Sequence, residues 1–203
     1  MKKHTENDRL PTWGYRLLRP ILAPIFKLYY HPKIENKEFI PIDGPIIFAG
    51  NHLHILDQCL VIISTKRVVH YMAKREYFDG PFAWFFKLTG VIRVDRAIHD
   101  DEAKELALNV LTRHRALGIF PEGTRNKTEE ILLPFKLGTV SLAKKTGATI
   151  VPFAITGDYK FRSKNLTITF TEPFKVSEHD DILKANRTLE NKIRNILEKR
   201  RDM

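Results

Sequence analysis

The sequence is poor in cysteine, with Cys59 as the only one among 203 residues. A single thiol cannot build a disulfide framework or a zinc site of several cysteines, and such scarcity is typical of a reducing compartment. Long apolar runs are also missing, since no stretch approaches the roughly 18 apolar residues that a membrane-spanning helix needs. The basic first residues lack the apolar core and the small-residue cleavage site of a signal peptide. We therefore expect neither a transmembrane span nor a secretory leader.

Acidic residues are scarce relative to basic ones, with 24 Asp and Glu against 34 Lys and Arg, which gives a net charge of +10. This excess predicts an anionic partner: nucleic acid, a lipid surface or a phosphorylated substrate. It is clustered, because residues 1–31, 58–75 and 182–203 each carry a net +4. A composition of 43% hydrophobic and 29% charged residues excludes disorder as the global state. A chain of this length can bury the core of one substantial domain.

We divide the chain into a short N-terminal amphipathic helical segment, residues 1–35, and a domain over residues 36–203. In the segment, apolar side chains recur at helical spacing and define one face: Trp13, Leu17, Ile21, Ile25 and Leu28. Pro20 and Pro24 interrupt the pattern, so we expect two short helices or a kinked one. Two roles are open for this face. It packs on the core of the domain, or, with Trp and Tyr beside Arg and Lys, it lies in the headgroup layer of a membrane.

Strand-like and helix-like patterns alternate through the domain. Six apolar runs are typical of strands, at residues 45–50, 68–73, 91–94, 116–120, 149–155 and 166–170. Three helices are expected, one beginning at residues 100–102 and running through 111, and two at 137–145 and 180–199. This alternation predicts the α/β class, with a largely parallel central sheet flanked by helices. Ligands of such sheets bind beyond the carboxyl ends of the strands, where polar motifs follow in this chain.

The first polar motif, GNHLHILDQ, follows the strand at 45–50 directly. His52 and Asp57 are five positions apart, about 140° around a regular helix, so they can meet only if His52 lies in the loop before a helix. Gly50 and Asn51 supply that turn. Asp57 would then hold one ring nitrogen of His52 and leave the other free to take a proton from a substrate hydroxyl. His52 and Asp57 are therefore candidate catalytic residues.

The same motif allows a competing interpretation as a metal site, since His52, His54 and Asp57 resemble part of a hydrolase metal loop. The common His-x-His-x-Asp-His pattern would place Asp at position 56 and His at position 58, where this chain has Leu56 and Gln58. The other histidines form no tight cluster along the chain. We therefore expect no metal site and a structural or hydrogen-bonding role for His54.

Charged residues follow three further strands. Arg96 ends the run GVIRVDR and is well placed for a bidentate phosphate contact. Glu122, Gly123 and Arg125 lie in the turn FPEGTRN, where Gly123 allows a tight turn or the close approach of a ligand. Lys74 adds positive charge after the second strand and is a candidate substrate-binding residue. Taken singly, each of these residues also fits a solvated surface turn.

Together and in this order, NHLHILD, GVIRVDR, FPEGTRN and IVPFAI resemble the four sequence blocks of the glycerolipid acyltransferase family. The resemblance covers about residues 40 to 175, is strongest for the bacterial 1-acyl-glycerol-3-phosphate acyltransferases, and is most specific at FPEGTR. It implies transfer of a fatty acyl group from a thioester to a glycerol-phosphate hydroxyl.

The resemblance also implies roles for individual residues. His52 would be the general base, and Asp57 would orient its ring. Acceptor binding would fall to the second and third blocks, at Arg96, Glu122, Gly123 and Arg125. The chain departs from the family at His54, where Ser is common, and at Gln58, where Pro is common.

The partners implied by the resemblance are a lysophosphatidic acid acceptor and an acyl thioester of coenzyme A or acyl carrier protein. No cofactor or metal is expected, because a thiolate leaves without metal assistance. We expect the protein on an anionic membrane surface, at the cytoplasmic face of the cell membrane. Alternatives are glycerol 3-phosphate or another lyso-lipid as acceptor, and a metal-dependent hydrolase. Nucleic acid is not expected, since the aromatics cluster with aliphatics, as in PFAWFF, and no nucleic-acid motif is recognisable.

Overall fold

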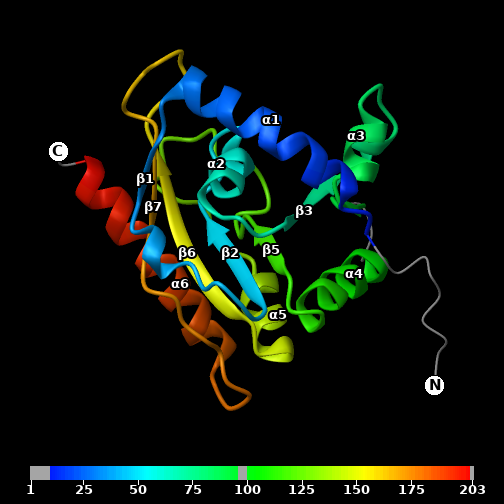
Figure 1. Ribbon diagram of the computed structural model, residues 1–203. Helices are drawn as coiled ribbons and strands as arrows, with labels where there is room; N and C mark the ends of the chain where they lie inside the picture. Colours follow the sequence, from blue (N-terminus) through cyan, green and yellow to red (C-terminus); the bar gives the residue numbers. More distant parts are fainter. Residues whose placement is uncertain (1–9, 96–99, 202–203) are drawn as a thin grey trace.

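Seven strands form one sheet in the order β1-β7-β6-β2-β5-β3-β4 (Figure 1). The computed structural model describes residues 10–95 and 100–201. β2 to β6 run parallel, whereas β7 is antiparallel to β6 and pairs with β1 at the edge. The strands are β1 (Lys33–Glu35), β2 (Ile46–Gly50), β3 (Val69–Lys74), β4 (Ile92–Val94), β5 (Ala116–Ile119), β6 (Thr149–Thr156) and β7 (Thr167–Phe170). The predicted α/β class with a largely parallel sheet is confirmed.

Helices cover both faces of the sheet, with α1 and α2 on one face and α4, α5 and α6 on the other (Figure 1). The short helix α3 lies against the N-terminal part of α1. The helices are α1 (Trp13–Tyr30), α2 (Asp57–Ser64), α3 (Ala83–Leu88), α4 (Asp101–Thr112), α5 (Gly138–Thr146) and α6 (Ile182–Arg201), with 3-10 turns η2 (Lys37–Phe39) and η3 (Arg75–Phe78).

The central strand β2 is buried on both faces. Ile46 and Phe48 pack toward α1 and α2, and Ile47 and Ala49 pack toward α4, α5 and α6. All four side chains are fully buried. This two-sided burial explains why the strand is a continuous apolar run in the sequence rather than an alternating one.

The predicted strands and helices of the domain are present in the structure. Each of the six predicted strands is found within one residue at either end, and the three predicted helices are α4, α5 and α6. α4 begins after Asp100 because the Asp100 side chain accepts the Ala103 N–H at 2.9 Å, an N-cap hydrogen bond. β1 and α3 were not predicted, since three and six residues are too short for a hydrophobic period to register.

The N-terminal apolar stretch forms one uninterrupted helix, α1, which contains both prolines. The alternative of two short helices is therefore wrong. Pro20 and Pro24 are both exposed. The carbonyls that lose their helical partners belong to Arg16 and Pro20, which are exposed as well. Water can hydrogen-bond these carbonyls, and the helix therefore continues through both prolines.

The predicted apolar face of α1 points away from the domain, so of the two roles left open for it, packing on the core is excluded. Its five members are between 56% and 72% exposed: Trp13, Leu17, Ile21, Ile25 and Leu28. A second row of side chains, including Tyr15, Ala23 and Phe26, faces the domain instead. Both rows have helical spacing, so periodicity alone could not decide which one is buried. None of the helices in the described part of the chain has the length and hydropathy needed to cross a bilayer.

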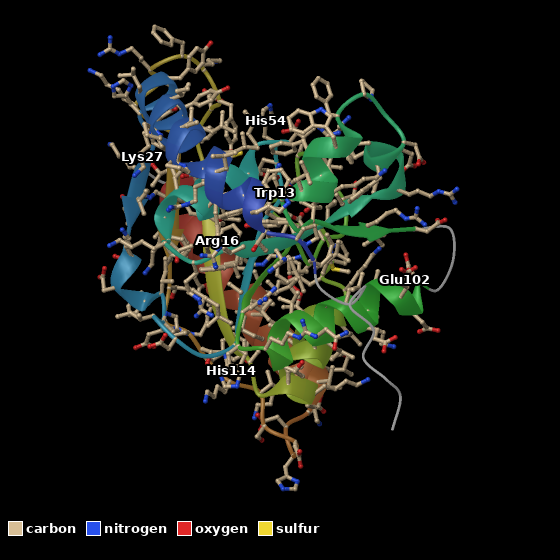
Figure 2. The ribbon with its side chains drawn as sticks, turned by 45° about the vertical axis from the view of Figure 1, so that its right-hand side comes forward. Trp13, Arg16, Lys27, His54, Glu102 and His114 are labelled. Atoms are coloured by element: carbon tan, nitrogen blue, oxygen red, sulfur yellow. The ribbon has the colours of Figure 1, made fainter. Side chains whose placement is uncertain are left out.

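The loops after the parallel strands converge at the carboxyl edge of the sheet. Figure 2 shows His54, just after β2, on the side of the molecule where α1 and α3 lie, and His114, just before β5, at the opposite end. The polar motifs that follow β2, β3 and β5 are thereby brought to one edge of the sheet.

Candidate active site

His52 and Asp57 meet just beyond β2. His52 lies in the turn after the strand, and Asp57 is the first residue of α2. Nδ1 of His52 is 2.8 Å from Oδ2 of Asp57, so the two side chains pair across the junction of loop and helix as their spacing predicts. Because Nδ1 faces the carboxylate, Nε2 is the ring nitrogen left to face a substrate.

The Asp57 carboxylate is fully buried and hydrogen-bonded at both oxygens. Besides His52, Oδ2 accepts the N–H groups of Leu53 at 2.6 Å and His54 at 2.8 Å. Oδ1 accepts the hydroxyl of Tyr159 at 2.7 Å. A buried carboxylate requires such partners, and these fix the orientation of Asp57 beneath the imidazole.

The loop after β5 holds His52 by both its ring and its peptide. The imidazole stacks on Phe120 with 4.0 Å between ring centroids and 11° between planes. The His52 N–H donates to Glu122 Oε1 at 2.7 Å, and its carbonyl accepts the Asn126 N–H at 2.7 Å. The position of His52 is therefore set by a segment some 70 residues further along the chain.

The Glu122 carboxylate accepts hydrogen bonds from two segments of the chain, one of which is the His52 turn. Its side chain is buried, and its second oxygen, Oε2, accepts the Leu133 N–H at 2.9 Å. Burial raises the pKa of Glu122, an effect opposed by the hydrogen bonds from Leu133 and His52. The carboxylate thus joins the His52 turn to the segment that leads toward α5.

Asn51 fixes the direction in which the chain leaves β2. Its side chain is 1% exposed and bonds to one residue of β6: Oδ1 accepts the Ile155 N–H at 2.7 Å, and Nδ2 donates to the Ile155 carbonyl at 2.9 Å. The amide replaces one further pair of backbone hydrogen bonds just past the end of the strand. Sequence reasoning treated Asn51 only as part of a turn and missed this role, as it missed Phe120, Asn126 and Tyr159.

A cavity of about 1360 Å³ opens beside His52. Part of its wall is apolar and comes from α1 and α3, for example Leu22, Phe26 and Phe86. Another part is basic and comes from the loops at the carboxyl edge of the sheet, where Lys74 and Arg125 lie. The cavity can therefore take a ligand with a hydrocarbon portion and an anionic portion.

The predicted site residues fall into three groups. His52, Lys74, Gly123 and Arg125 line the cavity. Asp57 and Glu122 lie behind this wall, in contact with His52. Arg96 lies outside the described residues.

Gly123 brings a further cation to the cavity. It adopts a positive φ of +69°, and a Cβ at this position would lie 2.9 Å from Nζ of Lys136. The glycine lets the Lys136 side chain lie directly across the turn. Lys136 also lines the cavity, so it joins Lys74 and Arg125 as a basic group there.

His54 and Cys59 have the surroundings of structural side chains. The ring of His54 stacks on Tyr159 at 4.3 Å, and its Nδ1 accepts the Leu56 N–H at 3.3 Å. Within residues 10–95 and 100–201, no three His, Cys, Asp or Glu side chains gather as metal ligands would. Burial, with Asp57 nearby, raises the pKa of Cys59 to about 11, so its thiol is protonated at neutral pH and a poor nucleophile.

Three proteins that this chain resembles in sequence are all acyltransferases of one kind. A family model described as acyltransferase matches residues 31–156. The chain is 33% identical over 136 residues to the 1-acyl-sn-glycerol-3-phosphate acyltransferase of Borreliella burgdorferi, covering 66% of this chain and 54% of that protein. For the protein of the same name from Cocos nucifera the identity is 31% over 160 residues, covering 73% and 51%. For that of Bacillus subtilis it is 30% over 145 residues, covering 70% and 71%. The chain thus spans about half the length of the first two relatives.

The fold is also similar to a solved one. The crystal structure of the 1-acyl-sn-glycerophosphate acyltransferase PlsC from Thermotoga maritima matches with a TM-score of 0.75 and 21% identity. The match covers 93% of this chain and 83% of that chain. At this identity the likeness concerns the arrangement of the helices and strands.

Proposed function

The chain belongs to the acyltransferase family, and from this we propose that it moves a fatty acyl group from a thioester to the sn-2 hydroxyl of 1-acyl-glycerol 3-phosphate, which yields phosphatidic acid. The observation that carries the proposal is the 2.8 Å contact between His52 and Asp57 at the wall of a large cavity that is partly apolar and partly basic.

His52 acts as the general base in this proposal. A substrate alcohol is a poor nucleophile at neutral pH, so Nε2 of His52 takes its proton as the oxygen attacks the thioester carbonyl. Asp57, on the other side of the ring, keeps Nδ1 protonated and stabilises the imidazolium that forms. The tetrahedral intermediate then expels the thiolate, which receives the proton from His52. The protein need supply no nucleophile of its own.

The basic part of the cavity wall suits the phosphate of the acceptor. Arg125 offers a planar fork of donors for phosphate oxygens, and Lys74 adds a cation in the same cavity. Gly123 lets the Lys136 side chain lie across the turn as a further cation, and Glu122 holds that turn to the His52 peptide. We assign Arg96 to the same task on the sequence resemblance alone.

The donor is proposed to be acyl-coenzyme A or acyl carrier protein, with its acyl chain along the apolar wall. No metal or other cofactor enters the proposed reaction, because the leaving thiolate needs no Lewis acid.

We place the protein on an anionic membrane surface, at the cytoplasmic face of the cell membrane. The exposed apolar face of α1, with Trp13 and neighbouring Arg and Lys side chains, suits the boundary between headgroups and acyl chains. Trp84 and Phe82, which are 56% and 67% exposed beside α1, extend the same kind of surface. A lyso-lipid acceptor reaches the cavity from such a membrane without passing through water.

The test is acyl transfer to labelled lysophosphatidic acid with each donor, in wild type and His52→Ala. Loss of the general base should lower kcat/KM by about 10²- to 10⁴-fold and leave the circular dichroism spectrum unchanged. His179→Ala, in an exposed loop, is the matched control and should keep wild-type activity.

Two outcomes would contradict the proposal. Normal turnover by His52→Ala would remove the proposed base. Wild-type transfer to glycerol 3-phosphate, but not to lysophosphatidic acid, would assign a different acceptor.

A further inference from the structure

We propose that Tyr159 is a positioning residue for the His52–Asp57 pair, one whose hydroxyl holds the Asp57 carboxylate in the orientation that His52 requires. The expected effect on kcat rests on the proposed function. The expected effect on the His52–Asp57 hydrogen bond rests on the geometry alone.

The hydrogen bonds of Asp57 divide unequally between its two oxygens. Oδ2 receives His52 and the N–H groups of Leu53 and His54, all from the same short turn. Oδ1 receives the Tyr159 hydroxyl at 2.7 Å, from a loop 102 positions further along the chain. Among the described residues, Tyr159 is the only hydrogen-bond donor to Oδ1, so without it the buried carboxylate is held only on the side of the turn that it orients.

Tyr159 is itself held by aromatic contacts on two sides. Its ring stacks on His54 at 4.3 Å and meets the edge of Tyr30, on α1, at 5.7 Å. The same loop is tied to the end of α1 by the Arg162 N–H, which donates to the Tyr29 carbonyl at 2.9 Å, and by the contact of Phe161 with Tyr29. The hydroxyl is therefore delivered to Asp57 from a fixed position.

The surroundings keep the Tyr159 hydroxyl a donor. Burial, together with the charge of Asp57, raises the pKa of Tyr159 far above its ordinary value. The other titratable groups around the pair are His54 from the turn, Cys59 on α2, Tyr71 on β3, Glu122 after β5 and Tyr30 on α1. Tyr159 does not line the cavity, so its hydroxyl acts on substrate only through Asp57.

Tyr159→Phe removes this single hydroxyl and keeps the ring. We expect kcat to fall about 10- to 100-fold, the effect of one hydrogen bond to a charged group, with KM for lysophosphatidic acid unchanged.

The matched control is Tyr29→Phe, which removes the same atom from a neighbouring tyrosine of the aromatic cluster and should leave kcat and KM as in wild type. A second measurement needs no turnover: the low-field proton NMR signal of the His52 Nδ1–H, assigned by its absence in His52→Ala. This signal should be sharp in wild type and Tyr29→Phe, and broadened by solvent exchange in Tyr159→Phe.

Failure of this proposal differs from failure of the proposed function. A wild-type protein that acylates no lyso-lipid overturns the proposed function, while the NMR comparison still tests Tyr159. If Tyr159→Phe is folded, as its thermal melt shows, and keeps the wild-type kcat and NMR signal, Tyr159 does not position the pair. A fall in kcat with an unbroadened NMR signal overturns the proposal as well.

Discussion

At the scale of single residues, hydrogen bonds to two distant segments position His52. Glu122 and Asn126 bond its peptide from the loop after β5, and Asn51, its neighbour, bonds to Ile155 on β6. Each of these bonds is local in space and remote in sequence. The accuracy of the His52–Asp57 geometry therefore depends on polar residues that touch no substrate.

Asn51→Leu tests this dependence. The substitution leaves the buried N–H and carbonyl of Ile155 without partners, which should lower the free energy of unfolding by about 2–6 kcal/mol, since each of the two unsatisfied groups costs about 1–3 kcal/mol. Acyl transfer by the folded protein should fall too, because His52 loses its fixed exit from β2. Urea unfolding followed by tryptophan fluorescence measures the first effect. Asn191→Leu, exposed on α6, is the control and should change stability by less than about 0.5 kcal/mol. Equal losses in the two variants would contradict the role of Asn51.

At the scale of elements, α1 has two apolar rows, and the fold uses one of them. Tyr15 and Phe26 face α2 and the cavity, while Ile21 and its row face outward. Arg19 joins α1 to α2 by donating from Nε to the Ile62 carbonyl at 3.2 Å and from a second nitrogen to the Thr65 carbonyl. The outward row contributes little to the fold and is free to contact lipid.

Ile21→Asp places a charge in the outward row. We expect it to weaken binding to phosphatidylglycerol vesicles about 10- to 100-fold, the effect of losing one Ile side chain buried in lipid. The free energy of unfolding should change by less than about 0.5 kcal/mol. Ile42→Asp makes the same change at an 86% exposed position in the loop before β2 and should leave vesicle binding intact. Cosedimentation with vesicles compares the two. Equal binding by both variants and wild type would argue against a lipid contact through this row.

At the scale of the whole molecule, His70 couples the stability of the fold to pH. Its ring is fully buried on β3, Nδ1 donates to the Gly90 carbonyl at 2.7 Å, and no described group pairs with Nε2. Burial lowers the pKa of His70 below its ordinary value of 6.5. The folded protein therefore holds His70 neutral at pH values where the unfolded chain is already protonated.

Stability should consequently fall as the pH drops below about 6.5 and keep falling until the pKa of folded His70 is passed, at up to about 1.4 kcal/mol per pH unit. His70→Asn keeps an amide donor toward Gly90 but cannot titrate. The free energy of unfolding of wild type, minus that of His70→Asn, should therefore be constant above pH 6.5 and decrease below it. Urea titrations between pH 5 and 8 measure this difference. Parallel curves over that range would show that His70 titrates alike in both states.

Much of the architecture follows from the sequence, because its signals are local. β2 to β7 of the sheet, the last three helices, and the pairing of His52 with Asp57 all come from hydrophobic periods and from a spacing of five residues. The FPEGTR turn follows its strand for the same local reason. The sequence does not show which row of α1 is buried. The rows of Leu17 and Phe26 both have helical spacing, and only the packing of α1 on the domain leaves the first exposed and the second partly buried.

The sequence by itself determines the α/β class, the family motifs and the identity of the candidate base and its carboxylate partner. Only the tertiary structure decided what holds that pair. Tyr159 and Glu122 reach it from 102 and 70 positions away, and Asn51, beside His52, is bonded to Ile155, 104 positions further along the chain. The physical reason is that a hydrogen bond depends on distance and angle in space, and neither leaves a periodic trace along the chain. The outward direction of one apolar row of α1 was likewise decided by tertiary packing, because the other row is the one that contacts the domain.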